Sequence, residues 1–376
     1  MEIKTLGELC DIVSGGTPSR SKAEFWNEGT IPWIKIGNIK GKYVNEADEF
    51  ITQKGLAGSS AKMLAKGTVL YTIFATLGEV GILDIDACTN QAIAGLTIKD
   101  TNQLSIDYLY YYLRSKKAYV NNIGRGVAQN NINMSILKSF EVPLPELSRQ
   151  TEIVEITSKV SRIIETRQQE LECLDNLIKA RFVEMFGDLA SPECLWNKRK
   201  LIEVCVDKDD IKCGPFGTQL SKDEYMESGI AVWEIPQINT AFKSRPIHFI
   251  TSEKAEQLKV YTIISGDIAM SRKGNVGKCA IFPDNYPAGI IHSDVLRIRL
   301  NSQLVNPMFM MCQLHFSEAV TRQIELVSSG AIMAGVNVTK LKQIYVHVPP
   351  VELQNQFADF VRQIDKSKFV EITALP

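Results

Sequence analysis

The fold is decided by residues 146–188, which read ELSRQTEIVEITSKVSRIIETRQQELECLDNLIKARFVEMFGD. This run follows Pro145 and contains no glycine or proline before Gly187, which predicts one helix of about 40 residues. Apolar residues recur along it at steps of three and four, with one shift of a single residue: Ile153, Ile156, Val160, Ile163, Ile164, Leu171, Leu174 and Ile178. Such a stripe predicts a coiled-coil partner. At 1.5 Å per residue the helix would be about 60 Å long, more than one globule needs, so we expect it to separate two bodies.

The sequences on the two sides of this helix resemble each other at a spacing of roughly 200 residues. Four pairs of segments carry the similarity: LGELC (6–10) with LIEVC (201–205), IPWIKIGNI (31–39) with AVWEIPQIN (231–239), KGTVLYTIFATLGEVG (66–81) with SGDIAMSRKGNVG (265–277), and GVAQNNINMSILKSFEVPLP (126–145) with GAIMAGVNVTKLKQIYVHVP (330–349). The second pair matches the segment of Trp33 to that of Trp233, and Gln150 and Gln354 follow in step. A repeat of this length is too long for a solenoid unit and indicates a duplicated domain.

Each copy combines strand and helix patterns. Short β-rich runs such as TVLYTIFA (68–75) and LRIRL (296–300) alternate with turn residues, and a tyrosine- or methionine-rich helical stretch follows at 107–119 and 306–316. Aromatic and methionine residues at helical spacing are expected to pack in a core. The pattern therefore predicts an α+β fold.

Four segments are expected along the chain: a first globule at 1–145, the long helix at 146–188, a second globule at 189–348, and a shorter helix at 349–376. The last segment has an apolar stripe of only about 20 residues: Phe357, Phe360, Val361 and Ile364. The two helical arms are therefore expected to be unequal.

Composition limits the possible functions. The chain has 376 residues, 42 basic and 43 acidic side chains and a net charge of −1, so any surface that binds nucleic acid must be a local basic one. Eight cysteines without a CxxC pair and four histidines that do not cluster predict no metal site, and we expect buried cysteines and no cofactor. Without a membrane-length apolar run or a signal peptide, a cytoplasmic protein that binds no membrane is expected.

No catalytic residues are expected. An adenine methyltransferase needs a polar residue before Pro-Pro and an aromatic residue after it, to hold a flipped adenine. HVPPV at 347–351 has Val348 and Val351 in these places, and no P-loop is present for ATP hydrolysis. The chain is therefore not expected to be an enzyme by itself.

Together these features resemble the specificity subunit of type I restriction-modification systems over essentially the whole chain. The resemblance lies in SGGTPS (14–19) with IPWIKIGNI, in GPFGTQL (214–220) with GDIAMSRKGNVGKCAIF (266–282), and in LPELSRQTEIV (144–154) with MFGD (185–188) around the long helix. It implies two pseudo-repeated α/β target-recognition domains separated by a long spacer helix, against which the shorter C-terminal helix packs antiparallel. It also implies a subunit without catalysis of its own.

The resemblance further implies the partners. Each domain would read one half of a split sequence in double-stranded DNA, and the helices would recruit DNA adenine methyltransferase subunits and ATP-dependent restriction subunits. A distal helix shorter than is usual in this family is the one departure. A duplicated scaffold that binds only proteins is the alternative, and a gel shift on random duplexes, with and without the methyltransferase, separates the two.

The candidate DNA-binding residues are polar side chains beside glycine-rich turns, chosen because Arg and Lys read guanine, Asn and Gln read adenine, and Ser and Thr bond either. In the first globule they are Thr17, Ser19, Lys35, Asn38, Lys40, Arg125, Gln129 and Asn130. In the second, where residues 270–299 hold five basic and two acidic side chains, they are Arg272, Lys273, Asn275, Lys278 and Arg297, with Thr218, Gln219, Lys222, Gln237 and Asn239 as weaker candidates. Asn133 and Asn337 are equivalent, which favours a shared helix cap over base reading.

The unequal helices predict an uncovered apolar stretch on the long one. The residues expected to lack a cover are Leu171, Leu174, Leu177, Ile178 and Phe182. Because an exposed stripe of this size normally marks an interface, we expect methyltransferase binding or self-association there.

Overall fold

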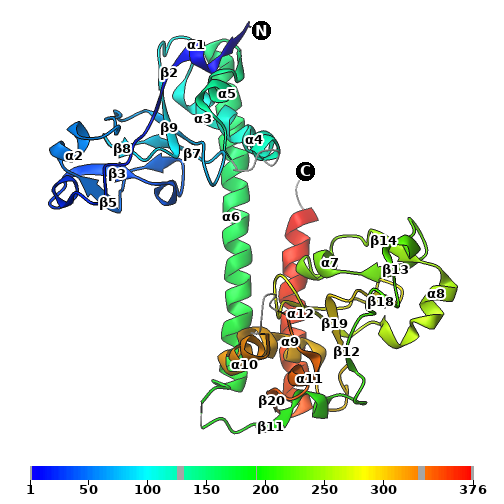
Figure 1. Ribbon diagram of the computed structural model, residues 1–376. Coiled ribbons are helices and arrows are strands. Elements are labelled where there is room, and N and C mark those ends of the chain that lie inside the picture. Colours follow the sequence, from blue (N-terminus) through cyan, green and yellow to red (C-terminus); the bar gives the residue numbers. More distant parts are fainter. Residues whose placement is uncertain (1, 125–130, 192, 329–334, 374–376) are drawn as a thin grey trace. The chain divides into compact units, whose positions relative to one another are not determined.

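The computed structural model describes residues 2–124, 131–191, 193–328 and 335–373 (Figure 1). It divides into two compact units, Met1–Arg167 and Gln168–Pro376, and each is described by itself. Both units mix helix and sheet, which confirms the predicted α+β class. No helix within the described ranges is long and apolar enough to span a bilayer.

In its described residues the first unit contains three sheets, with strand orders β2-β9-β6-β7-β4, β5-β3-β8 and β1-β10. The strands are β1 Glu2–Thr5, β2 Cys10–Ser14, β3 Ile31–Ile34, β4 Tyr43–Val44, β5 Glu49–Ile51, β6 Val69–Thr72, β7 Val80–Leu83, β8 Cys88–Thr89, β9 Ile93–Ile98 and β10 Glu141–Leu144. The helices are α1 Leu6–Leu9, η1 Ala23–Phe25, η2 Ile36–Asn38, α2 Gln53–Ala57, α3 Ile106–Ser115, α4 Lys117–Gly124 and α5 Met134–Lys138.

The part of the second unit that the structure describes also contains three sheets, with orders β12-β19-β16-β17, β14-β13-β18-β15 and β11-β20. The strands are β11 Asn197–Lys200, β12 Ile211–Cys213, β13 Ile230–Trp233, β14 His248–Ile250, β15 Thr262–Ile263, β16 Ile268–Ser271, β17 Cys279–Ile281, β18 Gly289–Ile291, β19 Val295–Ile298 and β20 Tyr345–Val348. The helices are η3 Leu201–Val204, η4 Lys222–Glu224, α7 Ile235–Asn239, α8 Ser252–Gln257, η5 Lys259–Tyr261, α9 Pro307–Phe316, α10 Glu318–Ser328, α11 Val338–Leu341 and α12 Val351–Thr373.

The two units repeat one topology. The strand order β2-β9-β6-β7 recurs as β12-β19-β16-β17, and the antiparallel pair β1-β10 recurs as β11-β20. The strand β3 pairs antiparallel with β5 and parallel with β8, just as β13 pairs antiparallel with β14 and parallel with β18. The duplication inferred from the sequence is therefore a duplication of the fold.

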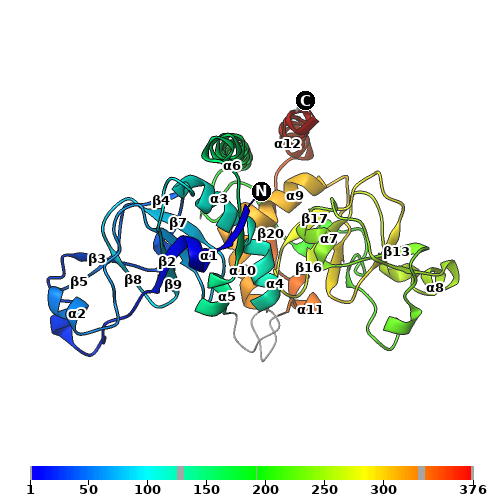
Figure 2. The same ribbon diagram turned by 90° about the horizontal axis from the view of Figure 1, so that it is seen from above.

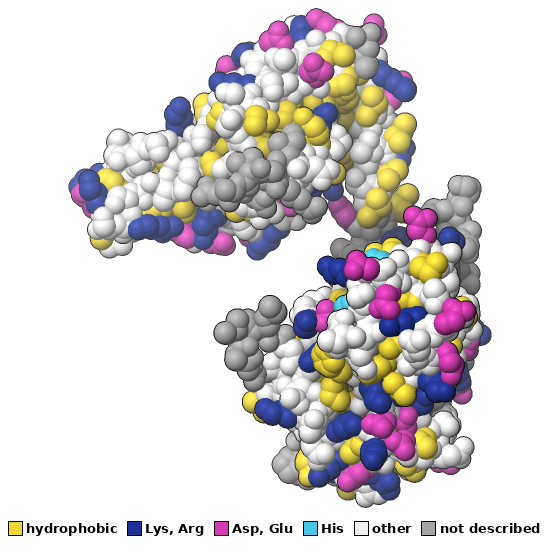
Figure 3. All heavy atoms as spheres, turned by 45° about the vertical axis from the view of Figure 1, so that its right-hand side comes forward, with side chains coloured by type: hydrophobic (Ala, Val, Ile, Leu, Met, Phe, Trp, Pro, Cys, Tyr) yellow, Lys and Arg dark blue, Asp and Glu magenta, His cyan; other side chains and the backbone are white. Residues whose placement is uncertain are grey.

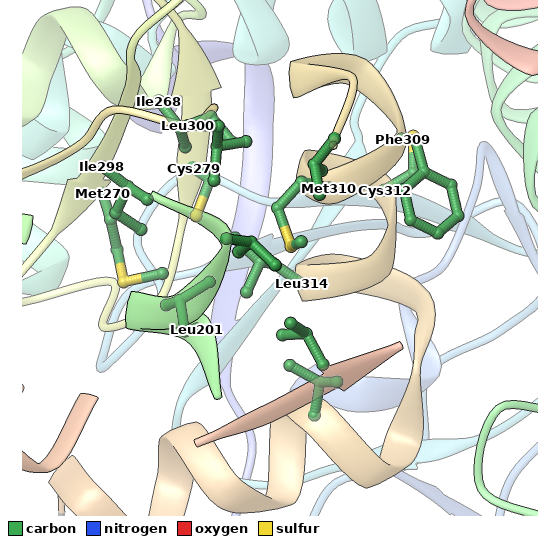
Figure 4. Close-up of a cluster of buried hydrophobic side chains, with 14 of the residues drawn as sticks. Leu201, Ile268, Met270, Cys279, Ile298, Leu300, Phe309, Met310, Cys312 and Leu314 are labelled. Carbon is green, nitrogen blue, oxygen red and sulfur yellow. The ribbon is translucent and has the colours of Figure 1, made fainter. Parts of the chain in front are cut away.

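The aromatic and methionine stretches form core, as their spacing predicts. In the first unit, Tyr108, Leu109 and Leu113 of α3 are buried against the five-stranded sheet. In the second unit, Phe309 and Met310 of α9 belong to a cluster that also holds side chains of β16, β17 and β19 (Figure 4). Each helical stretch thus packs on one sheet of its own unit, β2-β9-β6-β7-β4 in the first and β12-β19-β16-β17 in the second.

The two equivalent asparagines cap equivalent helices, which confirms the prediction of a shared cap. The side chain of Asn133 accepts a hydrogen bond from the backbone N–H of Ile136 at the start of α5. The side chain of Asn337 accepts one from the N–H of Lys340 at the start of α11. Both bonds satisfy an amide that a helix leaves without an internal acceptor in its first turn.

The predicted long helix is α6, Leu147–Phe186, a single element of 40 residues. Pairs of opposite charge three residues apart support it near both ends, at Arg149–Glu152 and Arg181–Glu184. Its C-terminal part belongs to the second unit, where α12 packs against it (Figure 2).

The two helices run antiparallel in that unit. The rings of Phe182 and Phe357 have their centroids 5.5 Å apart, and Nζ of Lys368 lies 2.8 Å from Oδ1 of Asp175. Contacts further along α12 therefore meet residues earlier in α6. This confirms the antiparallel arrangement expected of the shorter helix.

One part of the expected uncovered stretch was wrong. Phe182 is only 2% exposed, because its ring stacks on Phe309 of α9 and meets Phe357 of α12, and Ile178 is buried in the same cluster. Leu177 and Leu171 remain exposed, and Leu174 is partly exposed. The exposed apolar side chains of α6 lie mostly earlier in the helix: Ile156, Val160, Ile163 and Ile164.

A buried glutamine in the first turn holds each of the two helices α6 and α12 to the unit in which the helix begins. Gln150 accepts a hydrogen bond from the backbone N–H of Ser105, the cap of α3, and donates to the carbonyls of Gln103 and Pro145. The side chains of both Gln150 and its equivalent Gln354 are completely buried.

Gln354 repeats this pattern in the second unit. It accepts from the N–H of Asn306, the cap of α9, and donates to the carbonyls of Leu304 and Pro349. The same three bonds therefore fix where α6 begins in the first unit and where α12 begins in the second.

Candidate nucleic-acid interface

The strand registers define which residues of the two units are equivalent. Trp33 pairs with Glu49 across β3 and β5, and Val232 pairs with His248 across β13 and β14. Glu49 and His248 are thus equivalent, as are Trp33 and Val232, at a constant difference of 248 − 49 = 232 − 33 = 199 residues. The same difference relates Gly15 to Gly214, whose N–H groups bond the carbonyls of Ile93 and Val295. These two carbonyls are equivalent at 295 − 93 = 202 residues, so the difference of 199 holds for the segment from Gly15 to Ile51.

Matching the segments of Trp33 and Trp233 at a spacing of 200 residues is therefore out of register by one. Side chains alternate between the faces of a strand, so a shift of one residue places two side chains on opposite faces. Trp33 packs in a small cluster with Ile31 and Ile51, whereas Trp233 packs in a different cluster with Phe242 and Phe282. The two tryptophans have no common role.

The first unit gathers charged side chains beside its glycine-rich turn. Nζ of Lys35 lies 2.5 Å from Oε1 of Glu49, and a guanidinium nitrogen of Arg20 lies 2.5 Å from Oε2 of the same carboxylate. Arg20 also stands over the ring of Trp26, 3.7 Å from its centroid. Arg20 and then Lys35 hold the pKa of Glu49 below its usual range.

The other candidates of the first unit are placed as follows. Thr17, Ser19 and Lys40 are exposed, with the hydroxyl of Thr17 bonded to the side chain of Gln91. The side-chain oxygen of Asn38 accepts from the N–H of Lys35 and caps a short helix. Arg125, Gln129 and Asn130 lie outside the described residues. The structure therefore brings Lys35 and Asn38 into contact, directly after the central strand β3 of the small sheet.

In the second unit an equivalent pair occupies the same place with opposite polarity. Glu234 is equivalent to Lys35, since both cap the helix after the central strand, and its Oε2 lies 2.7 Å from Nδ1 of His248. The ring of Tyr225 stacks on the imidazole with centroids 4.5 Å apart. Burial first, and the charges of Glu234 and Asp294 after it, raise the pKa of Tyr225.

The basic loop of the second unit is a partly tethered surface. Nζ of Lys273 lies 2.8 Å from Oδ1 of Asp294, and the amide of Asn275 lies 3.5 Å from the side-chain oxygen of Asn239. Arg272 donates to the carbonyls of Val336 and Ser293, so its guanidinium is held by the fold.

The remaining exposed candidates in this unit lie on the loop or in the first turns after β12. They are Lys278, Thr218, Gln219 and Lys222. On the face in Figure 3 basic side chains are mixed with acidic ones, in keeping with the near-zero net charge. Any nucleic-acid contact therefore depends on particular side chains rather than on a broad basic field.

Two candidates in the second unit were wrong. Arg297 is 5% exposed, and its guanidinium donates hydrogen bonds to the carbonyls of Thr262 and Asp209, which stabilises the fold. Gln237 is buried, with its amide donating to the carbonyl of Arg245 and its oxygen accepting from the N–H of Glu234. Neither side chain reaches a surface on which DNA could lie.

Sequence reasoning missed Arg20, Glu49 and the pair Glu234–His248. Arg20 directly follows the SGGTPS segment, but the sequence does not show that a carboxylate and an indole hold its guanidinium. The constant difference of 199 residues is the signal that would have found the pairs, because it aligns Lys35 with Glu234 and Glu49 with His248.

The cysteines are mostly buried, as expected. Cys10, Cys88, Cys205, Cys279 and Cys312 are buried, whereas Cys173 is exposed and Cys194 and Cys213 are intermediate. Burial raises the pKa of the Cys10 thiol to about 12 and that of Cys88 to about 11, so both remain protonated at neutral pH. Among the described residues, no three His, Cys, Asp or Glu side chains gather in a way that could hold a metal ion.

Comparison with known proteins gives a consistent result. The family model of the type I restriction modification DNA specificity domain matches residues 1–174 and again residues 195–374. The type I restriction enzyme MjaIX specificity subunit of Methanocaldococcus jannaschii is 25% identical, over 96% of this chain and 86% of that protein. The EcoR124I/EcoR124II specificity subunit of Escherichia coli is 28% identical over 47% of this chain and 48% of its own length.

The fold has a counterpart among solved structures. The type I restriction-modification S subunit from M. genitalium superposes with a TM-score of 0.53 at 16% identity, over 98% of this chain and 90% of that one. At this level of identity the likeness concerns the fold, including its two repeated domains.

Proposed function

The chain belongs to the type I restriction modification DNA specificity domain family, and from this premise we propose that it reads a bipartite DNA target, one half-site with each unit. The family comprises the non-catalytic subunits that read the DNA target of type I restriction-modification systems. In this proposal the first target-recognition domain comprises 1–145 and the second 189–348. The segments 146–188 and 349–376 serve as spacer helices.

One observation carries the proposal of two separate readers. The units share strand order and register, yet the exposed residues at equivalent places differ. At the constant difference of 199 residues, Thr17 corresponds to Phe216 and Lys40 to Asn239. A common scaffold with different side chains on its loops is what two readers of different sequences require, because base edges are distinguished by the donors and acceptors that meet them.

The proposed contacts are divided between bases and phosphates. Lys40, Lys222, Lys273 and Lys278 are exposed cations suited to phosphates, which fix a protein's position on the duplex without reading sequence. Thr17, Ser19, Thr218, Gln219, Asn239 and Asn275 are exposed neutral side chains suited to base edges. Lys35, Asn38 and Arg272 are bonded within their own unit and would act mainly by shaping the loops.

The helices are proposed to recruit the catalytic partners. Ile156, Val160, Ile163 and Ile164 of α6 are about half exposed or more. Leu171 and Leu177 continue this exposed set, and Leu174 between them is partly exposed. A run of large apolar side chains exposed along one helix is typical of a protein interface. We assign it to a DNA adenine methyltransferase subunit, with ATP-dependent restriction subunits joining the assembly.

Exchange of the second domain tests the proposal. Residues 195–345 are replaced by the equivalent domain of a relative, the chimera is assembled with the methyltransferase, and the methylated sequence is mapped. The proposal expects one half of the motif to change and the other half to stay. A simultaneous change in both halves would contradict two separate readers, and loss of all sequence preference in the wild-type complex would contradict DNA reading itself.

A further inference from the structure

Arg20, after the glycine-rich turn of the first unit, and Gln219, after that of the second, occupy equivalent places in the fold. The N–H groups of Gly15 and Gly214 make equivalent bonds, and the short helices Ala23–Phe25 and Lys222–Glu224 begin at equivalent positions, again at a difference of 199 residues. By this difference Arg20 is the counterpart of Gln219. Both side chains are exposed.

Arg20 is held in a fixed orientation although its side chain is 54% exposed. The central carbon of its guanidinium, Cζ, lies 3.7 Å from the centroid of the Trp26 ring, and one nitrogen contacts the Glu49 carboxylate at 2.5 Å. A guanidinium carries five N–H donors in a rigid plane, so a single carboxylate oxygen on one side leaves donors for another partner. Fixing such a fork in advance reduces the entropy lost when it binds.

Gln219 is held by a different contact. Its side-chain oxygen accepts a hydrogen bond from the hydroxyl of Tyr261 at 2.9 Å, which fixes the orientation of the amide. An amide oxygen has two lone pairs and the NH₂ group has two donors, so one acceptor site and both donors remain. That combination matches the acceptor and donor that adenine presents in the major groove.

The fold does not require an arginine at this position. The ion pair Lys35–Glu49 of the first unit corresponds in the second to a polar contact between Glu234 and His248, so a polar link at this place is common to both units. The contact of Arg20 with Glu49 has no counterpart in the second unit, since Gln219 there bonds Tyr261. A position at which the scaffold is kept and the side chain changes is the one expected to differ between two readers.

We propose that this position reads one base pair in each half-site, with Arg20 bonding guanine and Gln219 bonding adenine in the major groove. Glu49 and Trp26 are positioning residues that orient Arg20. The inference rests on the proposed function, because it needs each unit to lie on DNA, and it goes further by naming the side chain and the base that meet.

Base-preference measurements on assembled methyltransferase complexes test the proposal. Wild type, Arg20→Gln, Arg20→Lys and Gln219→Arg are each used to map the methylated motif and to bind duplexes that vary one base pair at a time. Both arginine variants should lower the preference for one guanine in the first half-site by about tenfold or more, because a bidentate contact distinguishes bases on that scale. Gln219→Arg should alter only one adenine position in the second half-site.

Matched variants separate base reading from a structural role. Lys22→Gln removes a nearby cation that stands over Phe25 and should leave every base preference unchanged. Glu49→Gln should reduce the preference at the same guanine as Arg20→Lys and at no other position. A structural role alone would weaken binding to all duplexes equally.

Two results would overturn the inference while leaving the proposed function intact. One is a wild-type first half-site without a specified guanine. The other is an unchanged motif, at unchanged preference, in both arginine variants. A wild-type complex that methylates no defined sequence would instead remove the proposed function itself.

Discussion

Replacing Gln354 by methionine should loosen the second unit at the point where α12 begins. The glutamine is completely buried and makes three hydrogen bonds: with the N–H of Asn306 at 2.9 Å and with the carbonyls of Leu304 at 3.1 Å and Pro349 at 2.7 Å. Methionine has a similar length and fills the space, so little cavity is created, but it leaves all three groups without partners. Each such group costs about 1 kcal/mol or more, so the free energy of unfolding of the second unit should fall by about 3 kcal/mol.

Hydrogen exchange and urea denaturation measure this loss. The Asn306 amide should exchange roughly a hundredfold faster, since every 1.4 kcal/mol is a factor of ten, and the urea midpoint of the second unit should fall. Gln150→Met is the matched control, because it breaks the same network in the first unit and should expose the Ser105 amide while Asn306 stays protected. A decrease of less than about 0.5 kcal/mol in the free energy of unfolding, as small as that of an ordinary surface substitution, would refute the role of Gln354 in holding α12 to the second unit.

Four further predictions concern pH, the length of the long helix, a phosphate contact and the partner-binding surface. Burial lowers the pKa of His315 and His347 below 6.5, so their contribution to the free energy of unfolding is fully present above pH 6.5 and is lost as the pH falls. The urea midpoint of the second unit should therefore be lower at about pH 5 than at about pH 7, and the difference should shrink in a variant that carries both His315→Gln and His347→Gln. Inserting four residues after Thr166 adds about 6 Å and turns the helix by about 400°, so methylome sequencing should show both half-sites with a spacer one or two base pairs longer. Two inserted residues turn the helix by about 200° and should abolish methylation. An unchanged spacer in the four-residue variant would show that the helix does not set the distance between the half-sites. Lys273→Ala should lower the salt slope of DNA binding by about one without changing the motif, and Leu174→Glu should weaken methyltransferase binding in pull-downs; equal behaviour of wild type and variant in either assay would reject that assignment.

Much of the architecture was predictable because it depends on regular patterns. The long helix expected at 146–188 is Leu147–Phe186, since a run without glycine or proline, an apolar helical period and flanking breakers determine a helix locally. The caps Asn133 and Asn337 could be predicted because a side chain present at the same place in both copies serves a need of the common fold.

The wrong predictions have a different cause. They concern residues that are buried by elements distant in the sequence. Ile178 and Phe182 continue the apolar stripe of α6, and only the approach of α9 and α12 shows that they are core. Arg297 is the residue type expected of a DNA contact, yet its guanidinium donates to the backbone carbonyls of Thr262 and Asp209 inside the unit. Burial of this kind is set by tertiary packing and has no signature in a local window.

The most direct test of the account is the methylated sequence itself. The chain is assembled with its methyltransferase in cells that lack other adenine methylation, and the modified sites are mapped. Two readers on one duplicated scaffold predict a motif of two specified half-sites that differ from each other, separated by a fixed number of unspecified base pairs. A single continuous motif, or methylation without a motif, would contradict the account.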